Sequence, residues 1–283
     1  FSIKIVDRIS LKEGEVRPAI SIKFKLKDFH IINTEIEKNF IKVSNNFSYE
    51  EFESKIKKNP EFIFLNEFTK RLNLKRLNDA DFKFFNQEIG IKINKTNELV
   101  VKYLEPLESR RIISELMILA NYKFSEFFRD NGLPGIFRSQ KKSTNLETSI
   151  IGDEVPFCFH RKVSPVEIAS TIDFHHGLGL DSYMQITSPI RRYMDTINMW
   201  QISSFLSNGK ILFDKRLIDK TISNLTPRLA TMKEKSKIIY KFWILKYINQ
   251  RKIHSLNGYI YSSLRDKYII FFNELNLFES ISK

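Results

Sequence analysis

The chain has 283 residues and a net charge of +13, with a pI of about 9.6. This length allows one large domain or two ordinary ones, and an apolar content of 42% with 25 phenylalanines excludes a disordered chain. The single cysteine, Cys158, excludes an internal disulfide framework and fits the reducing cytosol. No apolar run approaches the roughly 20 residues that span a bilayer. We therefore expect a cytoplasmic protein with no membrane partner, and a monomer, although the sequence does not fix the oligomeric state.

The positive charge is concentrated in one part of the chain. Residues 205–255 contain 12 lysines and arginines and three acidic residues. AT-rich coding raises the lysine content and so explains a high overall charge, but it does not explain why the charge is concentrated in this segment. A polyanionic partner, such as nucleic acid, explains it better.

The first third of the chain predicts two strands and then two helices. Residues 18–25 alternate apolar and polar side chains, as a half-buried strand does, and residues 30–43 continue the pattern. Ser48 can cap a helix that starts near Tyr49. The charged segment 57–76 predicts a further helix.

The middle of the chain predicts a hairpin and one regular helix. Two strand-like runs between residues 82 and 101 flank a turn at 94–97. Apolar residues at helical spacing predict a helix over 108–129, which Asn131-Gly132 would end. Residues 139–154 are polar and predict an exposed connection.

The last third predicts three helices followed by strands. Helices are expected over 190–207, 214–225 and 227–253, and the last is long and basic. After His254, alternating apolar residues predict strands, so a small β-module begins near residue 255.

The segment 175–195, HHGLGLDSYMQITSPIRRYMD, carries the most informative pattern. Pro189 suits the first turn of a helix that Thr187 or Ser188 would cap. Arg191 and Arg192 would then lie in that first turn, beside outward-pointing backbone N–H groups, and this arrangement suits phosphate. Cations are unfavourable at this end of a helix dipole, so an anionic ligand would compensate them. A solvated helix end is the alternative interpretation.

The order of the motifs resembles the RNB family of hydrolytic 3′-to-5′ exoribonucleases, the group of ribonuclease II and ribonuclease R. The matching segments are SLKEGEVRPAIS at 10–21, FSYEE at 47–51, ELMILAN at 115–121, GLPGIFR at 132–138, TSPIRRYMD at 187–195, and Glu234 in a basic helix. The resemblance implies an α+β fold, a mostly antiparallel sheet or barrel wrapped by helices. It also implies two domains, a partial catalytic domain over 1–254 and a truncated OB-type RNA-binding barrel over 255–283.

The resemblance also implies roles for single residues. Arg191 would be the catalytic residue that contacts the scissile phosphate and neutralises charge as it builds. Tyr49 would stack on the terminal nucleotide, and Glu115 would bond the ribose hydroxyls that distinguish RNA from DNA. The remaining implied RNA-binding residues are Glu234 at the 3′ end, Phe82 as a distant stacking aromatic, and Arg192 as a structural residue or a clamp on the RNA backbone. Without the resemblance, Tyr49 could equally be a packing residue, Glu115 a solvated carboxylate and Glu234 a local charge partner.

One part of the family pattern is missing from the sequence. The family binds divalent metal with an aspartate cluster that lies N-terminal to the SLKEGEVR segment, so here it would precede Phe1. We therefore expect no metal ligands in this chain, which would be a fragment that is inactive by itself. Neighbouring acids at Asp79 and Asp81, or at Asp153 and Glu154, do not make a Mg²⁺ site.

Two further features lie close to the arginine motif, a pair of histidines before it and a departure from the family pattern after it. His175 and His176 lack other ligands at metal-binding spacing, so we expect a hydrogen-bonded structural role for them. Met199-Trp200 stands where many relatives have His-Arg, and this removes a phosphate contact.

The sequence thus predicts a chain that binds single-stranded RNA. The intact parent would be a Mg²⁺-dependent 3′-to-5′ exoribonuclease that releases nucleoside monophosphates, with Mg²⁺ ligands upstream of residue 1. A catalytically inactive RNB-like RNA-binding protein is the alternative. A basic scaffold that recognises protein is a third possibility.

Overall fold

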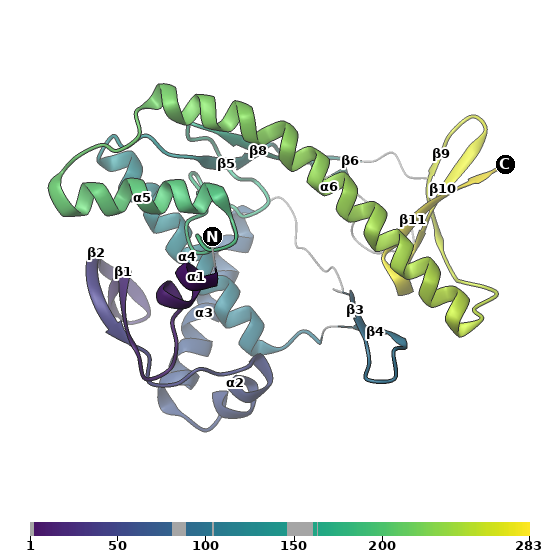
Figure 1. Cartoon of the computed structure of the whole chain (residues 1–283), viewed down its shortest axis with the longest axis horizontal. Helices are drawn as coiled ribbons and strands as arrows, with labels where there is room; N and C mark the ends of the chain where they lie inside the picture. The colour runs from purple at the N-terminus through teal and green to yellow at the C-terminus, as the bar shows by residue number, and fades with distance from the viewer. Residues whose placement is uncertain (1–2, 81–88, 104, 146–160, 163) are drawn as a thin grey trace. The chain divides into compact units, whose positions relative to one another are not determined.

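The computed structural model describes residues 3–80, 89–103, 105–145, 161–162 and 164–283. Helices are interspersed with antiparallel strands along the chain (Figure 1), as the α+β prediction requires. Contacts divide the chain into two compact units, which are residues 1–83, 107–142 and 164–224, and residues 84–106, 143–163 and 225–283.

The first unit opens with helix α1 (Ile3–Ile9) and a long antiparallel ribbon of β1 (Val16–Lys27) and β2 (His30–Lys42). Both strands confirm the sequence prediction. Asp28 and Phe29 connect them with φ angles of 50° and 62°, the left-handed pair that a tight hairpin turn requires. The ribbon packs Ile20, Ile22 and Ile36 against the core of the unit, so register is set by one apolar face.

Three helices follow in this unit: α2 (Tyr49–Ile56), α3 (Pro60–Asp79) and α4 (Glu108–Asp130). Ser48 caps α2 as predicted, in a reciprocal box in which its hydroxyl accepts from the Glu51 N–H and the Glu51 carboxylate accepts from the Ser48 N–H. The backbone N–H of Ser48 thereby holds the pKa of Glu51 below its usual value. Asn59 caps α3, with Pro60 in its first turn.

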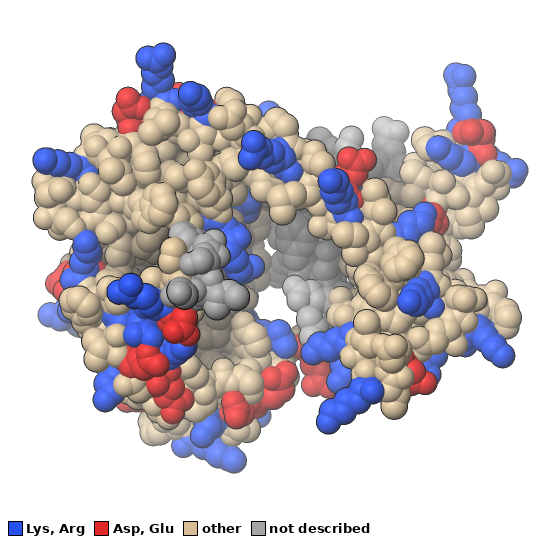
Figure 2. Space-filling view, in the orientation of Figure 1, with Lys and Arg blue, Asp and Glu red and all other residues tan. Residues whose placement is uncertain are grey.

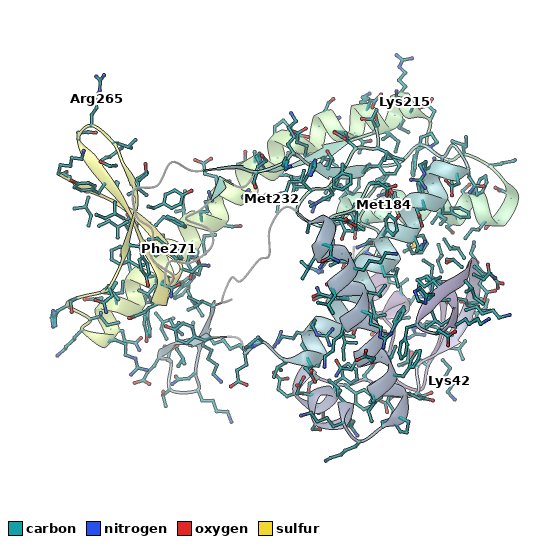
Figure 3. The ribbon with its side chains drawn as sticks, turned by 180° about the vertical axis from the view of Figure 1, so that it is seen from behind. Lys42, Met184, Lys215, Met232, Arg265 and Phe271 are labelled. Carbon is teal, nitrogen blue, oxygen red and sulfur yellow. The ribbon has the colours of Figure 1, made fainter. Side chains whose placement is uncertain are left out.

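The core of the first unit lies between α4, the chain that follows it, and α5 (Tyr193–Asn208). Met184, labelled in Figure 3, is fully buried there with Phe128 and Ile202. A Cβ on Gly135 would lie 2.7 Å from the Phe128 ring, so packing at this position requires glycine.

Strand β5 (Phe137–Gln140) pairs with β8 (Val166–Ala169), so the predicted connection at 139–154 begins inside a strand. The rest of that prediction from residue 146 lies outside the described residues. Two-residue strands β6 (Thr144–Asn145) and β7 (Arg161–Lys162) pair with each other in the second unit.

The second unit also contains a hairpin and a three-stranded sheet. The predicted hairpin is present as β3 (Ile89–Ile93) and β4 (Leu99–Tyr103). The sheet consists of β9 (Tyr259–Ser263), β10 (Lys267–Phe272) and β11 (Leu277–Ser282), with the 3₁₀ turn η2 (Asn273–Leu275) before the last strand. Residues 255–283 belong to the same compact unit as β3, β4 and most of α6. The predicted domain boundary after residue 254 therefore stays a prediction.

Helix α6 (Lys215–Arg251) is a single helix, whereas the sequence predicted two helices separated near residue 226. This prediction was wrong, because the helix continues through Pro227, which lies inside it. An interior proline costs one backbone hydrogen bond and about 3 kcal/mol, which a helix of 37 residues tolerates when it packs elsewhere. Ile244 of this helix is fully buried against Leu275 and Leu277.

The strands of the described residues form five small sheets, none of which closes into a barrel. None of the described helices combines the length and the apolar composition that crossing a bilayer requires.

We predict that Ser48→Ala destabilises the first unit by about 1 kcal/mol, because it removes the hydroxyl acceptor at the start of α2. Urea unfolding followed by circular dichroism measures the change. Ser44→Ala is the control, since Ser44 is exposed and lies outside any helix or strand. Equal stability of the two variants would contradict the capping role.

Candidate nucleic-acid interface

A buried carboxylate fixes the turn that carries the two adjacent arginines. Asp195, in the first turn of α5, is 0% exposed. Its Oδ2 accepts hydrogen bonds from the Ser188 backbone N–H at 2.9 Å and from Arg192 Nε at 3.0 Å. The Ser188 carbonyl in turn accepts from the backbone N–H groups of Arg191 at 3.3 Å and Arg192 at 3.1 Å. Residues 188–192 therefore form a closed turn whose conformation depends on one charge.

The start of α5 differs from the prediction. The helix begins at Tyr193 with Arg192 as its N-cap, and no side chain caps it. Pro189 therefore lies in the turn before the helix, and Thr187 and Ser188 are not its caps. The reason is that Asp195 takes the Ser188 N–H and the Thr196 hydroxyl donates to the Pro189 carbonyl at 2.6 Å, which closes the turn ahead of the helix.

The two arginines have different surroundings. Arg191 is exposed, and its Nη2 lies 3.4 Å from the Ser188 hydroxyl. Arg192 is mostly buried and its Nη2 lies 2.9 Å from the Asp195 carboxylate. The turn thus presents one solvent-facing guanidinium on a rigid base, while the other is neutralised by its own carboxylate.

A third arginine, Arg138 of β5, lies behind the turn. Its backbone N–H donates to the Tyr183 carbonyl at 2.8 Å, and its guanidinium interacts electrostatically with Tyr183, Arg192 and Asp195. Burial lowers the pKa of Arg138 from its usual value. Asp195 is thus paired with Arg192, and its charge also acts on Arg138.

His175 and Tyr183 complete the buried layer. Their rings meet edge to face at 5.5 Å, and the Tyr183 hydroxyl accepts from the side-chain amide of Asn121 at 3.1 Å. Burial lowers the pKa of His175 to about 4, so its ring is neutral at pH 7 and adds no charge. Nδ1 of His175 has no hydrogen-bond partner, and the expected hydrogen-bonded structural role of the ring stays a prediction.

Buried polar atoms without hydrogen-bond partners concentrate around these residues. In the described part of the chain they include Arg138 Nε, His175 Nδ1, Ser182 Oγ, Gln185 Oε1, Thr187 Oγ1, Arg192 Nη2 and Asp195 Oδ1. Arg192 Nη2 is close to Asp195 Oδ2 but is not aligned as a hydrogen bond. Such atoms are costly to bury, and their concentration marks a place that a polar ligand would complete.

Tyr49 is the first residue of α2 and is 39% exposed. The Arg110 guanidinium lies over its ring, 4.4 Å from the centroid, and Arg110 Nη2 is 3.7 Å from the Glu50 carboxylate. A partly exposed ring that is held by a cation is suited to stacking on a base.

Glu115 on α4 is buried, 4% exposed, and is not the solvated carboxylate that its sequence context alone suggested. Its oxygens accept from Arg76 Nη2 and from the Asn73 amide, both at 2.7 Å. Arg76 also donates to the Leu178 carbonyl at 3.2 Å, which joins α3 to the GLGL segment. The carboxylate thus has partners on α3 already, and its predicted contact with ribose stays a prediction.

The other predicted RNA-binding residues are placed differently. Glu234 is exposed on the part of α6 that belongs to the second unit. Lysine and arginine side chains recur along this helix, and acidic ones are few (Figure 2). Phe82 lies outside the described residues. Met199 packs against the apolar core, while Trp200 is 46% exposed on α5, so this pair provides no cation beside the turn.

The described residues do not fit a divalent metal. Mg²⁺ requires several convergent oxygen ligands, and no group of three or more histidine, cysteine, aspartate or glutamate side chains in the described part of the chain could hold a metal ion. Asp79 is the last residue of α3, while Asp81, Asp153 and Glu154 lie outside the described residues.

The sequence did not predict the residues that support the site. Arg76 and Asn73 meet Glu115 across about 40 positions in the chain, and no local pattern marks such a contact. Arg110 lies on the predicted helix at 108–129, but only the fold brings it to Tyr49. Arg138 carried a signal as the last residue of the GLPGIFR segment, which was not given a role.

Solved structures share this fold. An active-site mutant of the Dss1 exoribonuclease from Candida glabrata aligns with a TM-score of 0.80 at 19% identity, over 93% of this chain and 38% of that one. Mycoplasma genitalium RNase R in complex with ribose-methylated single-stranded RNA aligns at 0.73 and 14%, over 96% and 51%. Yeast Ssd1, described as a pseudonuclease, aligns at 0.71 and 16%, over 98% and 40%. At these identities the likeness concerns the fold, and it confirms the predicted fold class.

Curated relatives are named ribonucleases. An uncharacterized ribonuclease of Synechocystis is 27% identical, over 91% of this chain and 40% of the relative. The chloroplastic/mitochondrial ribonuclease II of Arabidopsis thaliana is 24% identical, over 87% and 33%. Mitochondrial exoribonuclease II of Schizosaccharomyces pombe is 36% identical, over 49% and 16%. The chain therefore spans less than half of the length of these relatives.

These names correct the prediction of a cytoplasmic protein. The relatives from Arabidopsis and Schizosaccharomyces pombe are organellar by name, so the single cysteine was an insufficient basis for the cytosol. A reducing interior that permits one free cysteine is not unique to the cytosol.

The sequence model of the RNB domain family matches residues 3–156 and 153–208, more than half of the chain. The match covers α1 to α5, and so includes the turn that Asp195 fixes as well as Tyr49 and Glu115. The chain belongs to the RNB domain family.

Proposed function

We propose that this chain binds single-stranded RNA as part of a 3′-to-5′ exoribonuclease that hydrolyses RNA to nucleoside monophosphates. The observation that carries the proposal is the exposed Arg191 guanidinium on the turn that Asp195 fixes, in a chain of the RNB family. A preorganised cation of this kind neutralises charge on a phosphate without reorganisation. The organellar names of relatives favour an organelle as the place of this activity.

The other residues would bind the RNA rather than react with it. Tyr49 would stack on the terminal base, with Arg110 on the opposite face of its ring. Glu115 would accept from ribose hydroxyls with the oxygen lone pairs that Arg76 and Asn73 leave free. Glu234, on the basic helix α6, would anchor the 3′ end, and Phe82 would stack further along the strand.

A Mg²⁺ requirement remains a prediction for the whole protein. The proposed contribution of this chain is to bind and orient the RNA.

A catalytically inactive RNA-binding protein is the second candidate. It is favoured by the fold likeness to yeast Ssd1, described as a pseudonuclease, and by Met199-Trp200, which provides no cation near the turn. The whole protein distinguishes the two: degradation of labelled single-stranded RNA in Mg²⁺ supports the enzyme, and binding without degradation supports the inactive relative.

We predict that the 283-residue chain binds a fluorescent single-stranded RNA with an affinity that falls steeply between low and moderate salt, because phosphate contacts release counterions. Arg191→Ala should weaken binding about tenfold by removing the exposed guanidinium. Fluorescence anisotropy measures both effects. Arg129→Ala, another exposed arginine, is the control and should bind like the wild type. Binding that is weak and indifferent to salt would instead favour a scaffold that recognises protein.

We expect the chain alone to degrade little or no RNA in Mg²⁺, since its sequence lacks the aspartate cluster with which the family binds metal. Gel analysis of an end-labelled strand measures this. If the chain does degrade the strand, and the double variant Asp79→Ala with Asp81→Ala abolishes the activity, then the metal site lies at these two residues and our account of it is wrong.

Asp195→Asn should destabilise the chain by about 2 kcal/mol and weaken RNA binding as well. The substitution keeps the shape but leaves the mostly buried Arg192 without its counter-charge. Urea unfolding gives the stability. The control is Asp130→Asn, which removes only a surface ion pair with Arg129, worth less than about 1 kcal/mol. Asp195 would not be the organising residue if both variants were equally stable.

A further inference from the structure

The region behind the arginine turn has more positive than negative charge. The Arg192 guanidinium is paired with the Asp195 carboxylate at 2.9 Å, and the charge of the same carboxylate also acts on Arg138. Tyr183 and His175 contribute no charge at pH 7, because burial raises the pKa of the tyrosine and lowers that of the histidine to about 4. One carboxylate therefore faces two guanidiniums, and the exposed Arg191 lies beside them in the chain.

Two buried hydrogen-bond donors in this region, Arg138 Nε and the Thr187 hydroxyl, have no acceptor. Arg192 Nη2 makes no aligned hydrogen bond, but it lies 2.9 Å from the Asp195 carboxylate. A buried guanidinium nitrogen without an acceptor costs folding free energy, and a second guanidinium of the same charge nearby adds to that cost. An oxyanion is the ligand class that accepts from several such donors and balances the charge.

The backbone places these donors on adjoining segments. Strand β5 holds Arg138 against Tyr183 through the 2.8 Å backbone hydrogen bond, and Phe137 forms a bridge with Met184. The chain then runs directly from Tyr183 to Thr187 and into the turn, where Ser188 is bonded to Asp195. Donors that are far apart in the sequence are thus carried by one connected layer of the first unit.

We propose that Arg138 and Thr187 are phosphate-binding residues, which together with the arginine turn hold a phosphodiester group of the RNA. This inference rests on the proposed function and deepens it. Arg191 supplies the exposed charge at this site, while Arg138 supplies charge from the buried side and Thr187 a neutral hydroxyl donor.

The salt dependence of RNA binding tests the role of Arg138. For a single strand, each lost phosphate contact to a cation lowers the slope of log K against log salt by about 0.7. Arg138→Met, which keeps an unbranched apolar stem and removes the guanidinium, should lower the slope by about this amount and weaken binding about tenfold at low salt. Arg129→Met, whose guanidinium is paired with Asp181, should leave the slope unchanged. A folded Arg138→Met variant with the wild-type slope would overturn the proposal.

Thr187→Val tests the same site without a change of charge or of volume. It should weaken RNA binding severalfold, with the salt slope unchanged and the melting temperature of the free chain not lowered, since the hydroxyl that it removes has no acceptor. Because valine is isosteric with threonine, this variant tests the proposed phosphate-binding site even if Arg138→Met does not fold. Wild-type affinity in Thr187→Val would show that the hydroxyl does not bind the ligand.

Inorganic sulfate separates this inference from the proposed function. At equal ionic strength, sulfate should raise the melting temperature of the wild type and of Arg129→Met more than that of Arg138→Met or Arg138→Lys, relative to chloride. If the chain binds no RNA but shows this difference, the anion site stands and the proposed function fails. If RNA binds while all variants respond alike to sulfate and to salt, the proposed function stands and the anion site is overturned.

Discussion

The buried carboxylate of Asp195 is the constraint on which the candidate site depends. It has no exposure to solvent, so its charge must be compensated inside the protein, and a backbone N–H and a guanidinium provide this compensation. Both partners lie in the turn before α5, so satisfying the carboxylate also fixes the turn. Arg192 is thereby held in the protein and Arg191 is left facing solvent.

A second buried acid of the first unit is likewise satisfied by several donors. Glu115 accepts from Arg76 and Asn73, and this contact ties α3 to α4 and, through Arg76, to the GLGL segment. Gly179 of that segment lies so close to the end of α3 that a Cβ would be 2.4 Å from the Arg76 carbonyl oxygen. Charge and close backbone packing together position the loop that leads to the arginine turn.

Much of the fold could be predicted because its signals are local. The alternation in β1 and β2, the Ser48 cap and the periodicity of α4 each depend on neighbouring residues. Two predictions of helix boundaries failed, and each failure has a physical cause. Pro227 does not break α6, since a long packed helix absorbs the loss of one hydrogen bond, and α5 starts at Tyr193 because Asp195 captures the Ser188 N–H.

The sequence by itself determined the family, because ordered motifs such as TSPIRRYMD survive where overall identity is low, and it determined the concentration of positive charge toward the C-terminal part. Only the tertiary structure decided how the arginines differ, because their neighbours come from distant segments. Packing that no local pattern encodes brings Arg138 within the electrostatic influence of Arg192 and Asp195, and it brings Arg110 over the ring of Tyr49. Burial, which sets the cost of an unpaired charge, is likewise a property of the folded chain.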